Sequence, residues 1–252
     1  MLIKEKFVDT KYGRVFYLEA GNGQKTIVFI HGWLGWPVMV KQLALKFGQG
    51  NFRIIAPYLP GHGLSFPLPH NFTFTDLVVV VDEFLKKLEI RKTDALIGHS
   101  LGGAIAWELA TADHDTKKLV IMDAFMNYTG RSLLTMIFSV AKDKLKDIVH
   151  EWRHEKDAIL DEFGVGVRKP QLLSPRKFWD LIKTVKITHT QVKNGLPVLA
   201  MWGKSDTVVP LRDYMSILGQ SSVKLVTFPG GHYWFEWHRD KMLEAIESFI
   251  NL

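Results

Sequence analysis

Short apolar segments rich in β-branched residues recur along the chain and predict seven β-strands. Most are bounded by Gly, Pro, Asn or Asp, the residues that commonly end strands. The predicted strands are Arg14–Ala20, Thr26–Ile30, Arg53–Pro57, Ala95–Gly98, Lys118–Asp123, Pro197–Gly203 and Lys224–Phe228. Helical patterns lie between several of them, at Thr75–Leu88 and Leu101–Thr111. This alternation is typical of a parallel sheet with helices on both faces, so the predicted fold class is α/β.

The alternation stops between Phe125 and about Thr190, where the pattern becomes helical. Apolar residues follow i, i+3, i+4 spacing at Leu134, Ile137, Ala141, Leu145, Ile148 and Trp152. A second helix is predicted to end near Gly164, and a third to begin with Ser174 as N-cap and Pro175 at the first helical position. We therefore expect a core of residues 1–124 and 191–252, with residues 125–190 inserted as a helical cap (lid). The cap is expected over one end of the sheet, where open α/β sheets bind ligands.

The amino-acid composition excludes several kinds of site and of chemistry. The chain has 252 residues, of which 47% are hydrophobic, enough to form a core without disulfides or metals. It contains no cysteine, which excludes disulfides, thiol catalysis and Cys-containing zinc sites. No secretory signal pattern opens the sequence, and no apolar run approaches the ~20 residues that span a bilayer. We expect a cytoplasmic protein without integral membrane association.

The positive charge is concentrated in one segment. The formal net charge is +6, and Arg131–Lys193 carries 13 Lys and Arg against 8 Asp and Glu. These charges alternate in sign along helical patterns and lack interleaved glycine and aromatic residues, so they predict a solvated surface and no nucleic-acid binding. The sequence leaves open whether this basic segment attracts anionic lipid and whether the chain is a monomer or a homodimer.

A candidate nucleophile lies directly between a predicted strand and a predicted helix. Residues Gly98–Gly102 read G-H-S-L-G, a G-x-S-x-G pattern, and Gly103 and Ala104 follow. A serine on so sharp a turn needs small neighbours, and the turn raises its hydroxyl into a cleft. The first N–H groups of the following helix point to where a carbonyl oxygen would gain charge. Ser100 is therefore the predicted nucleophile.

A base and an acid follow later strands. Serine needs a base to take its proton, and the base needs a third group to orient it. Asp206 lies in the loop after the strand that ends at Gly203, and His232 follows the strand that ends at Phe228. Parallel strands bring their carboxyl ends to one edge of the sheet, so Ser100, Asp206 and His232 are expected to meet there. No metal-ligand, Rossmann or P-loop pattern is present in the sequence, and no cofactor or metal is expected.

In this set of motifs, and in the chain order Ser, Asp, His, the sequence resembles the α/β-hydrolase superfamily, in particular carboxylesterases and monoacylglycerol-lipase-like serine hydrolases. The resemblance covers nearly the whole chain outside residues 125–190. It includes the His31-Gly32-Trp33 oxyanion loop and the Pro60–Ser65 turn, P-G-H-G-L-S. It implies a mostly parallel sheet flanked by helices, with the cap inserted after strand 6.

The resemblance also implies roles for individual residues. The backbone N–H groups of Trp33 and Leu101 would form the oxyanion hole, while His62 would be structural. Some family members take the acid from an earlier strand, where this chain has Asp123; we favour Asp206 and expect Asp123 to cap the junction with the cap. Candidate substrate-binding residues are apolar: Trp33, Leu34, Trp36, Phe125 and Met126.

The predicted function is hydrolysis of carboxylic esters with short to medium acyl chains (EC 3.1.1) through a Ser-His-Asp triad and an acyl-enzyme, with a small-molecule ester as partner. Cofactor-free haloperoxidase or perhydrolase, thioesterase, lactonase and C–C hydrolase activities remain alternatives, because fold alone does not fix function. A weakly catalytic ligand receptor is an alternative of a different class.

Overall fold

The structure is a computed structural model, and it describes residues 3–33, 39–47, 50–112, 114–132, 134–136, 138–139, 141–143, 175–193 and 195–251. Among these residues, no helix has the length and apolar character needed to cross a membrane.

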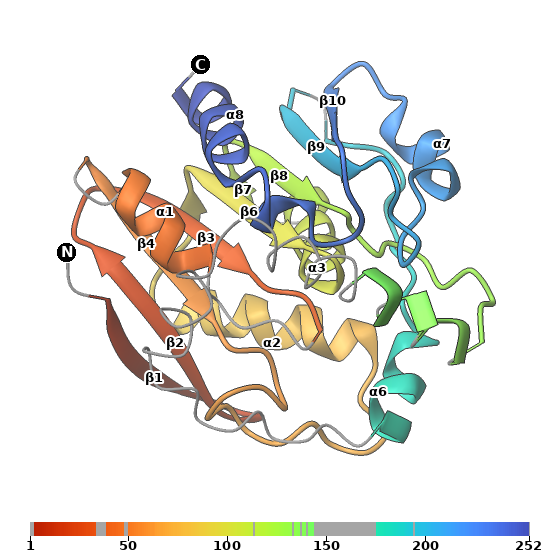
Figure 1. The fold of residues 1–252 in the computed structure, drawn as a ribbon. Coiled ribbons are helices and arrows are strands. Elements are labelled where there is room, and N and C mark those ends of the chain that lie inside the picture. The colour runs from red at the N-terminus through yellow and green to blue at the C-terminus, as the bar shows by residue number, and fades with distance from the viewer. Residues whose placement is uncertain are drawn as a thin grey trace, which may run out of the picture.

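An eight-stranded sheet runs through the molecule in the order β1-β2-β4-β3-β6-β8-β9-β10 (Figure 1). Its strands are β1 (Lys4–Thr10), β2 (Gly13–Gly21), β3 (Lys25–Ile30), β4 (Phe52–Pro57), β6 (Ala95–His99), β8 (Leu119–Met122), β9 (Val198–Gly203) and β10 (Val223–Phe228). β2 is antiparallel to both β1 and β4, and the remaining neighbours are parallel. Two short strands, β5 (Lys92–Thr93) and β7 (Asp115–Thr116), pair separately. The sheet is mostly parallel, as predicted.

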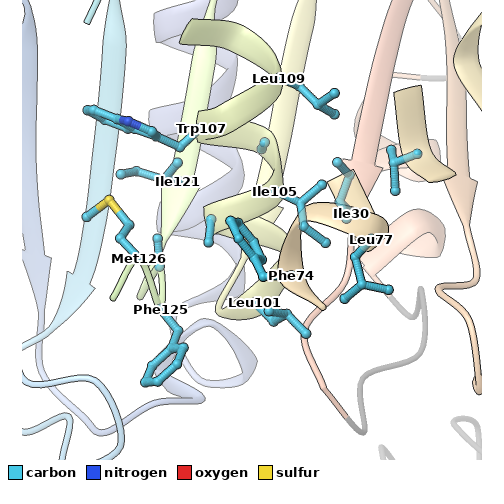
Figure 2. Close-up of a cluster of buried hydrophobic side chains, with 14 of the residues drawn as sticks. Ile30, Phe74, Leu77, Leu101, Ile105, Trp107, Leu109, Ile121, Phe125 and Met126 are labelled. Atoms are coloured by element: carbon cyan, nitrogen blue, oxygen red, sulfur yellow. The ribbon is translucent and has the colours of Figure 1, made fainter. Parts of the chain in front are cut away.

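Helices cover both faces of the sheet (Figure 1). Described helices are α1 (Met39–Phe47), α2 (Phe74–Lys87), α3 (Leu101–Thr111), α6 (Pro175–Ile182), α7 (Met215–Leu218) and α8 (Arg239–Asn251). The period-2 alternation of β3 sends Val28 and Ile30 into the hydrophobic cluster of α2 and α3, and Ile27 and Phe29 into the cluster of α1 and α8. Figure 2 shows the first cluster, in which Ile30, Phe74 and Ile105 lie together.

Local sequence explains the two helices next to the site. Thr73 and Asp76 form a capping box that begins α2: Thr73 accepts the Asp76 backbone N–H, and Asp76 accepts that of Thr73. All eleven residues of α3 are buried, consistent with its small, apolar sequence. A helix buried on all sides needs a largely apolar surface, and the one charged side chain of α3, Glu108, is paired with the backbone N–H and hydroxyl of Thr188.

The seven predicted strands are all present, each within one residue of its expected bounds, and the two helices predicted between strands are α2 and α3. Not predicted were the edge strand β1, the short strands β5 and β7, and the helices α1, α7 and α8.

Residues 125–190 leave the sheet after β8, the sixth strand of the main sheet in chain order. α6 begins at Pro175, as predicted, and its Phe178, Leu181 and Ile182 are buried in the core cluster. The helix end near Gly164 and the Ser174 N-cap lie outside the described residues.

Of the apolar stripe predicted at the start of the cap, Leu134 and Ala141 lie among the described residues and neither is buried, while the other four positions lie outside them. The described residues of 134–143 are helical, but Leu134 is 66% exposed and Ala141 is exposed, whereas Met136 and Asp143 are buried. Met136 and Asp143 are the two buried side chains among the described residues of this stretch. Asp143 is buried because it accepts backbone N–H groups of two core loops, a role that an apolar side chain cannot take.

Candidate active site

Ser100 occupies a strained turn between β6 and α3. Its φ of 53° and ψ of −119° lie in a region that side chains other than glycine rarely adopt. The neighbouring glycines are required by close packing: a Cβ on Gly98 would collide with the Gly102 carbonyl, and one on Gly102 with the Ile30 carbonyl. The structure therefore has the strand, sharp turn and helix that the sequence predicts.

Asp206 and His232 are joined at the adjacent ends of β9 and β10. His232 Nδ1 lies 2.8 Å from Asp206 Oδ2, and both side chains are buried. Asp206 Oδ1 accepts the backbone N–H groups of Val208 and Val209 at 2.7 and 2.8 Å. Because a carboxylate only accepts, Nδ1 carries the proton and Nε2 is left with a free lone pair. This is the tautomer that a general base needs.

Ser100 and His232 open onto one pocket. Its described lining also contains the aromatic and aliphatic side chains of Trp33, Leu101, Phe125, Met136, Phe178, Ile182 and Val208, together with Tyr233. Among the hydrogen bonds of the described residues, none joins Ser100 to His232. Such catalytic hydrogen bonds are often long without substrate.

The pocket contains some of the predicted substrate-binding residues. Trp33 and Phe125 line it. Met126 is not part of its described lining and is fully buried in the core cluster (Figure 2). Leu34 and Trp36 lie outside the described residues.

The predicted oxyanion loop touches the nucleophile turn. A Cβ on Gly32 would lie 2.9 Å from Ser100 Cβ, so the backbone just before Trp33 runs against the serine. Leu101 is the first residue of α3, where an N–H has no partner within the helix. The residue before Trp33 and the first residue of α3 therefore both adjoin Ser100.

Two buried histidines support this loop. His31 Nε2 accepts the Leu59 N–H at 3.0 Å, and His31 Nδ1 donates to the Gly32 carbonyl at 2.7 Å. Burial lowers the pKa of His31 to about 3 and that of His62 to about 4. Both rings are neutral near pH 7. His62 lies against His31, with ring centroids 4.8 Å apart, and is outside the described pocket lining, which agrees with the structural role expected for it.

Asp123 lies beside the Asp206–His232 pair. Its Oδ1 accepts the Gly203 N–H at 2.8 Å, and its Oδ2 accepts the indole N–H of Trp234. These partners belong to the core, so Asp123 does not cap the junction with residues 125–190 as expected. Burial, and secondly the charge of Asp206, raise the pKa of Asp123 well above its ordinary value.

Sequence analysis did not identify five of the pocket residues: Met136, Phe178, Ile182, Val208 and Tyr233. Two of them had a local signal, because Val208 and Tyr233 follow Asp206 and His232 within two residues. Phe178 and Ile182 are four residues apart on α6, a spacing that places them on one helix face.

Comparison with known proteins identifies the family of this chain. The model of the alpha/beta hydrolase family matches residues 27–245. A putative non-heme haloperoxidase of Mycobacterium phage D29 is 26% identical over 88% of this chain and 85% of its own. A 2-hydroxy-6-oxononadienedioate/2-hydroxy-6-oxononatrienedioate hydrolase of Pseudomonas sp. is 22% identical over 97% of this chain and 96% of its own.

Solved structures share the fold. The enol-lactonase of Burkholderia xenovorans LB400 superposes with a TM-score of 0.79 at 16% identity, covering 98% of this chain and 100% of that one. Other relatives are named as esterases or lipases. Since the family model spans most of the sequence, from β3 into α8, this chain belongs to the alpha/beta hydrolase family.

Proposed function

We propose that this chain is a serine hydrolase that cleaves carboxylic esters with short to medium acyl chains. One observation carries the proposal: Asp206 holds His232 Nδ1 at 2.8 Å, while the same histidine shares an apolar pocket with the strained Ser100. A cytoplasmic location, a helical cap at residues 125–190 and a site without metal or cofactor are parts of the same proposal.

The proposed reaction has two halves. His232 Nε2 takes the Ser100 proton, and the alkoxide attacks the ester carbonyl. The backbone N–H groups of Trp33 and Leu101 stabilise the tetrahedral oxyanion, and Asp206 keeps the imidazole oriented. His232 then protonates the leaving alcohol. Water activated by the same histidine opens the acyl-enzyme and restores Ser100.

The pocket supports a neutral, apolar acyl group. Its described lining has seven apolar side chains and no Lys, Arg, Asp or Glu. An apolar wall stabilises a bound alkyl chain by about 25 cal/mol for each Å² of apolar surface that is buried, and such binding needs few polar groups.

The same lining disfavours a C–C hydrolase acting on a diacid. The substrate named for the Pseudomonas relative is a dioate. Burying a carboxylate requires cationic or N–H partners, and the described part of this pocket offers no cationic side chain.

Hydrolysis of p-nitrophenyl esters from acetate to dodecanoate tests the proposal. We expect activity with an optimum at short or medium length, and a loss of at least about 10⁴-fold in kcat for Ser100→Ala and for His232→Ala. Ser221→Ala and His70→Ala are matched controls, because both residues are exposed and outside the pocket. An inactive wild type, or a Ser100→Ala variant as active as wild type, contradicts the proposal.

A second arm of the assay addresses the haloperoxidase relative. Adding peroxide to the active ester mixture measures whether the acyl-enzyme passes its acyl group to peroxide instead of water. We expect hydrolysis to dominate, and peracid as the main product would favour the perhydrolase alternative.

A further inference from the structure

A buried acid of the inserted segment contacts the loops that carry both Asp206 and His232. Asp143 is 1% exposed, although it lies between Lys142 and Lys144 in the most basic part of the sequence. Charged side chains are rarely buried so fully without a specific set of partners.

The partners of Asp143 are the backbones of those two loops. Its Oδ2 accepts the backbone N–H of His232 at 3.2 Å and that of Thr207 at 3.4 Å. Its Oδ1 accepts the Thr207 hydroxyl at 3.2 Å. One carboxylate thus bridges the residue after Asp206 and the predicted base itself.

The core loop is shaped to receive this carboxylate. A Cβ on Gly231 would lie 2.8 Å from the Asp143 carboxyl carbon, so any larger residue before His232 would push the acid away. The sequence thus places a glycine where an acid from a distant segment must approach the backbone.

A second charged residue of the inserted segment holds the other side of the same loop. Arg131 Nη1 donates to the Thr207 carbonyl at 2.6 Å and to the Val208 carbonyl at 3.2 Å. The Asp206 loop is therefore held on its N–H side by Asp143 and on its carbonyl side by Arg131.

We propose that Asp143 is a positioning residue for the hydrolytic reaction: by bridging Thr207 and His232 it fixes the Asp206 loop against the His232 loop. The inserted segment then aligns the Ser-His-Asp set as well as lining the pocket. This inference rests on the proposed function. Asp143 acts through the backbone of His232 and is outside the described pocket lining.

Replacement of Asp143 by Ala tests the bridge. It leaves the His232 N–H without its acceptor and frees the two loops to shift. A catalytic group misplaced by about 1 Å lowers the reaction rate about 100-fold. We expect kcat to fall about 10- to 100-fold. KM should change by less than about threefold, because the pocket wall is untouched.

Asp143→Asn separates hydrogen bonding from charge. The amide oxygen can replace Oδ2 as acceptor, and the amide N–H can donate to the Thr207 hydroxyl. We expect Asp143→Asn to recover most of the kcat lost in Asp143→Ala. An Asn variant as impaired as the Ala variant would overturn the positioning role in favour of a requirement for charge.

A double-mutant cycle locates the effect at Thr207. Thr207→Val removes the hydroxyl contact with Asp143 but keeps the shape of the side chain. In the background of Asp143→Ala it should cost nothing further, since the Thr207 hydroxyl acts through its contact with Asp143 and that partner is already gone. Additive losses would contradict the bridge. Lys142→Ala, an exposed neighbour, is the control and should retain wild-type kcat.

A readout without substrate keeps this inference separate from the proposed esterase activity. The proton that His232 donates to Asp206 should give a strongly downfield NMR resonance, assigned by its loss in Asp206→Ala. In Asp143→Ala we expect this resonance to broaden or shift while the melting curve stays cooperative. In Asp143→Asn we expect the resonance to be retained.

If the wild type hydrolyses no ester, the proposed function fails, yet the resonance still decides the role of Asp143. An unchanged resonance with unchanged kcat in Asp143→Ala would overturn it.

Discussion

Trp33 and Phe178 stack nearly face to face, with ring centroids 3.4 Å apart and ring planes 9° apart. Trp33 follows β3 in the predicted oxyanion loop, and Phe178 belongs to α6 of the inserted segment. Both rings line the pocket. The inserted segment therefore forms a wall directly beside the loop proposed to hold the oxyanion, and the size of that wall should select the substrate.

Phe178→Leu is expected to move the acyl-length optimum to longer esters. The smaller side chain leaves room for about one methylene more, and one methylene changes discrimination by about tenfold. The ratio of kcat/KM between a longer and a shorter p-nitrophenyl ester measures this. Phe249→Leu is the control, since this buried ring lies in the opposite core cluster, with α8. An equal change of preference in the control, or none in Phe178→Leu, would refute the assignment.

Gly32→Ala should lower kcat without unfolding the protein. The added methyl would lie 2.9 Å from Ser100 Cβ, and the oxyanion loop must retreat to admit it. A retreat that removes one oxyanion donor costs about 2.7–4 kcal/mol, or roughly 100- to 1,000-fold in kcat. Gly50→Ala is a suitable control, because the nearest atom to a Cβ there is the Phe47 carbonyl oxygen at 3.3 Å and Gly50 is not part of the described pocket lining. Equal activity of the two variants would place the oxyanion donors elsewhere.

Ser100→Gly should abolish hydrolysis and at the same time stabilise the fold. The backbone of Ser100 is strained at φ 53° and ψ −119°, which costs a non-glycine residue about 1–3 kcal/mol. Glycine relieves this strain, but its greater conformational freedom in the unfolded chain lowers the stability by about 0.5–1 kcal/mol. A net gain of about 1 kcal/mol in the free energy of unfolding is expected by denaturant titration. Ser100→Ala keeps the Cβ and should gain nothing, so equal gains for Ala and Gly would argue against strain.

The sequence identifies the strands and the candidate catalytic residues together, because each candidate lies shortly after a predicted strand. Central strands such as β3 are continuous apolar runs, and Ser100 and Asp206 closely follow the central strands β6 and β9, whereas His232 follows the edge strand β10. β1 escapes prediction because Lys4, Lys6 and Asp9 interrupt its apolar pattern. That composition suits the edge of a sheet, where most side chains remain exposed.

The contribution of the inserted segment cannot be predicted in this way. Asp143 resembles any surface acid between two lysines, and only tertiary contacts turn it towards Thr207 and His232. The expected stripe through Leu134 and Ala141 followed apolar spacing alone. The buried Asp143 satisfies backbone N–H groups, and the spacing of apolar residues gives no information about that requirement.

Asp123→Asn should change how stability depends on pH. Burial and the charge of Asp206 outweigh the N–H donors of Gly203 and Trp234, so the pKa of Asp123 in the folded protein lies well above 3.8. From about pH 4 up to that raised pKa, the folded state keeps a proton that the unfolded state has lost, and wild-type stability falls as pH rises. The asparagine variant has no such proton. The difference in free energy of unfolding, variant minus wild type, should therefore rise with pH by up to about 1.4 kcal/mol per pH unit. Any effect of the amide on stability that does not depend on pH leaves this slope unchanged. Urea titrations at pH 4, 5, 6 and 7 measure the slope, and Asp180→Asn, at an exposed acid paired with Lys183, should show little of it. A difference that stays level or falls with pH would mean that Asp123 is ionised beside Asp206 throughout this range.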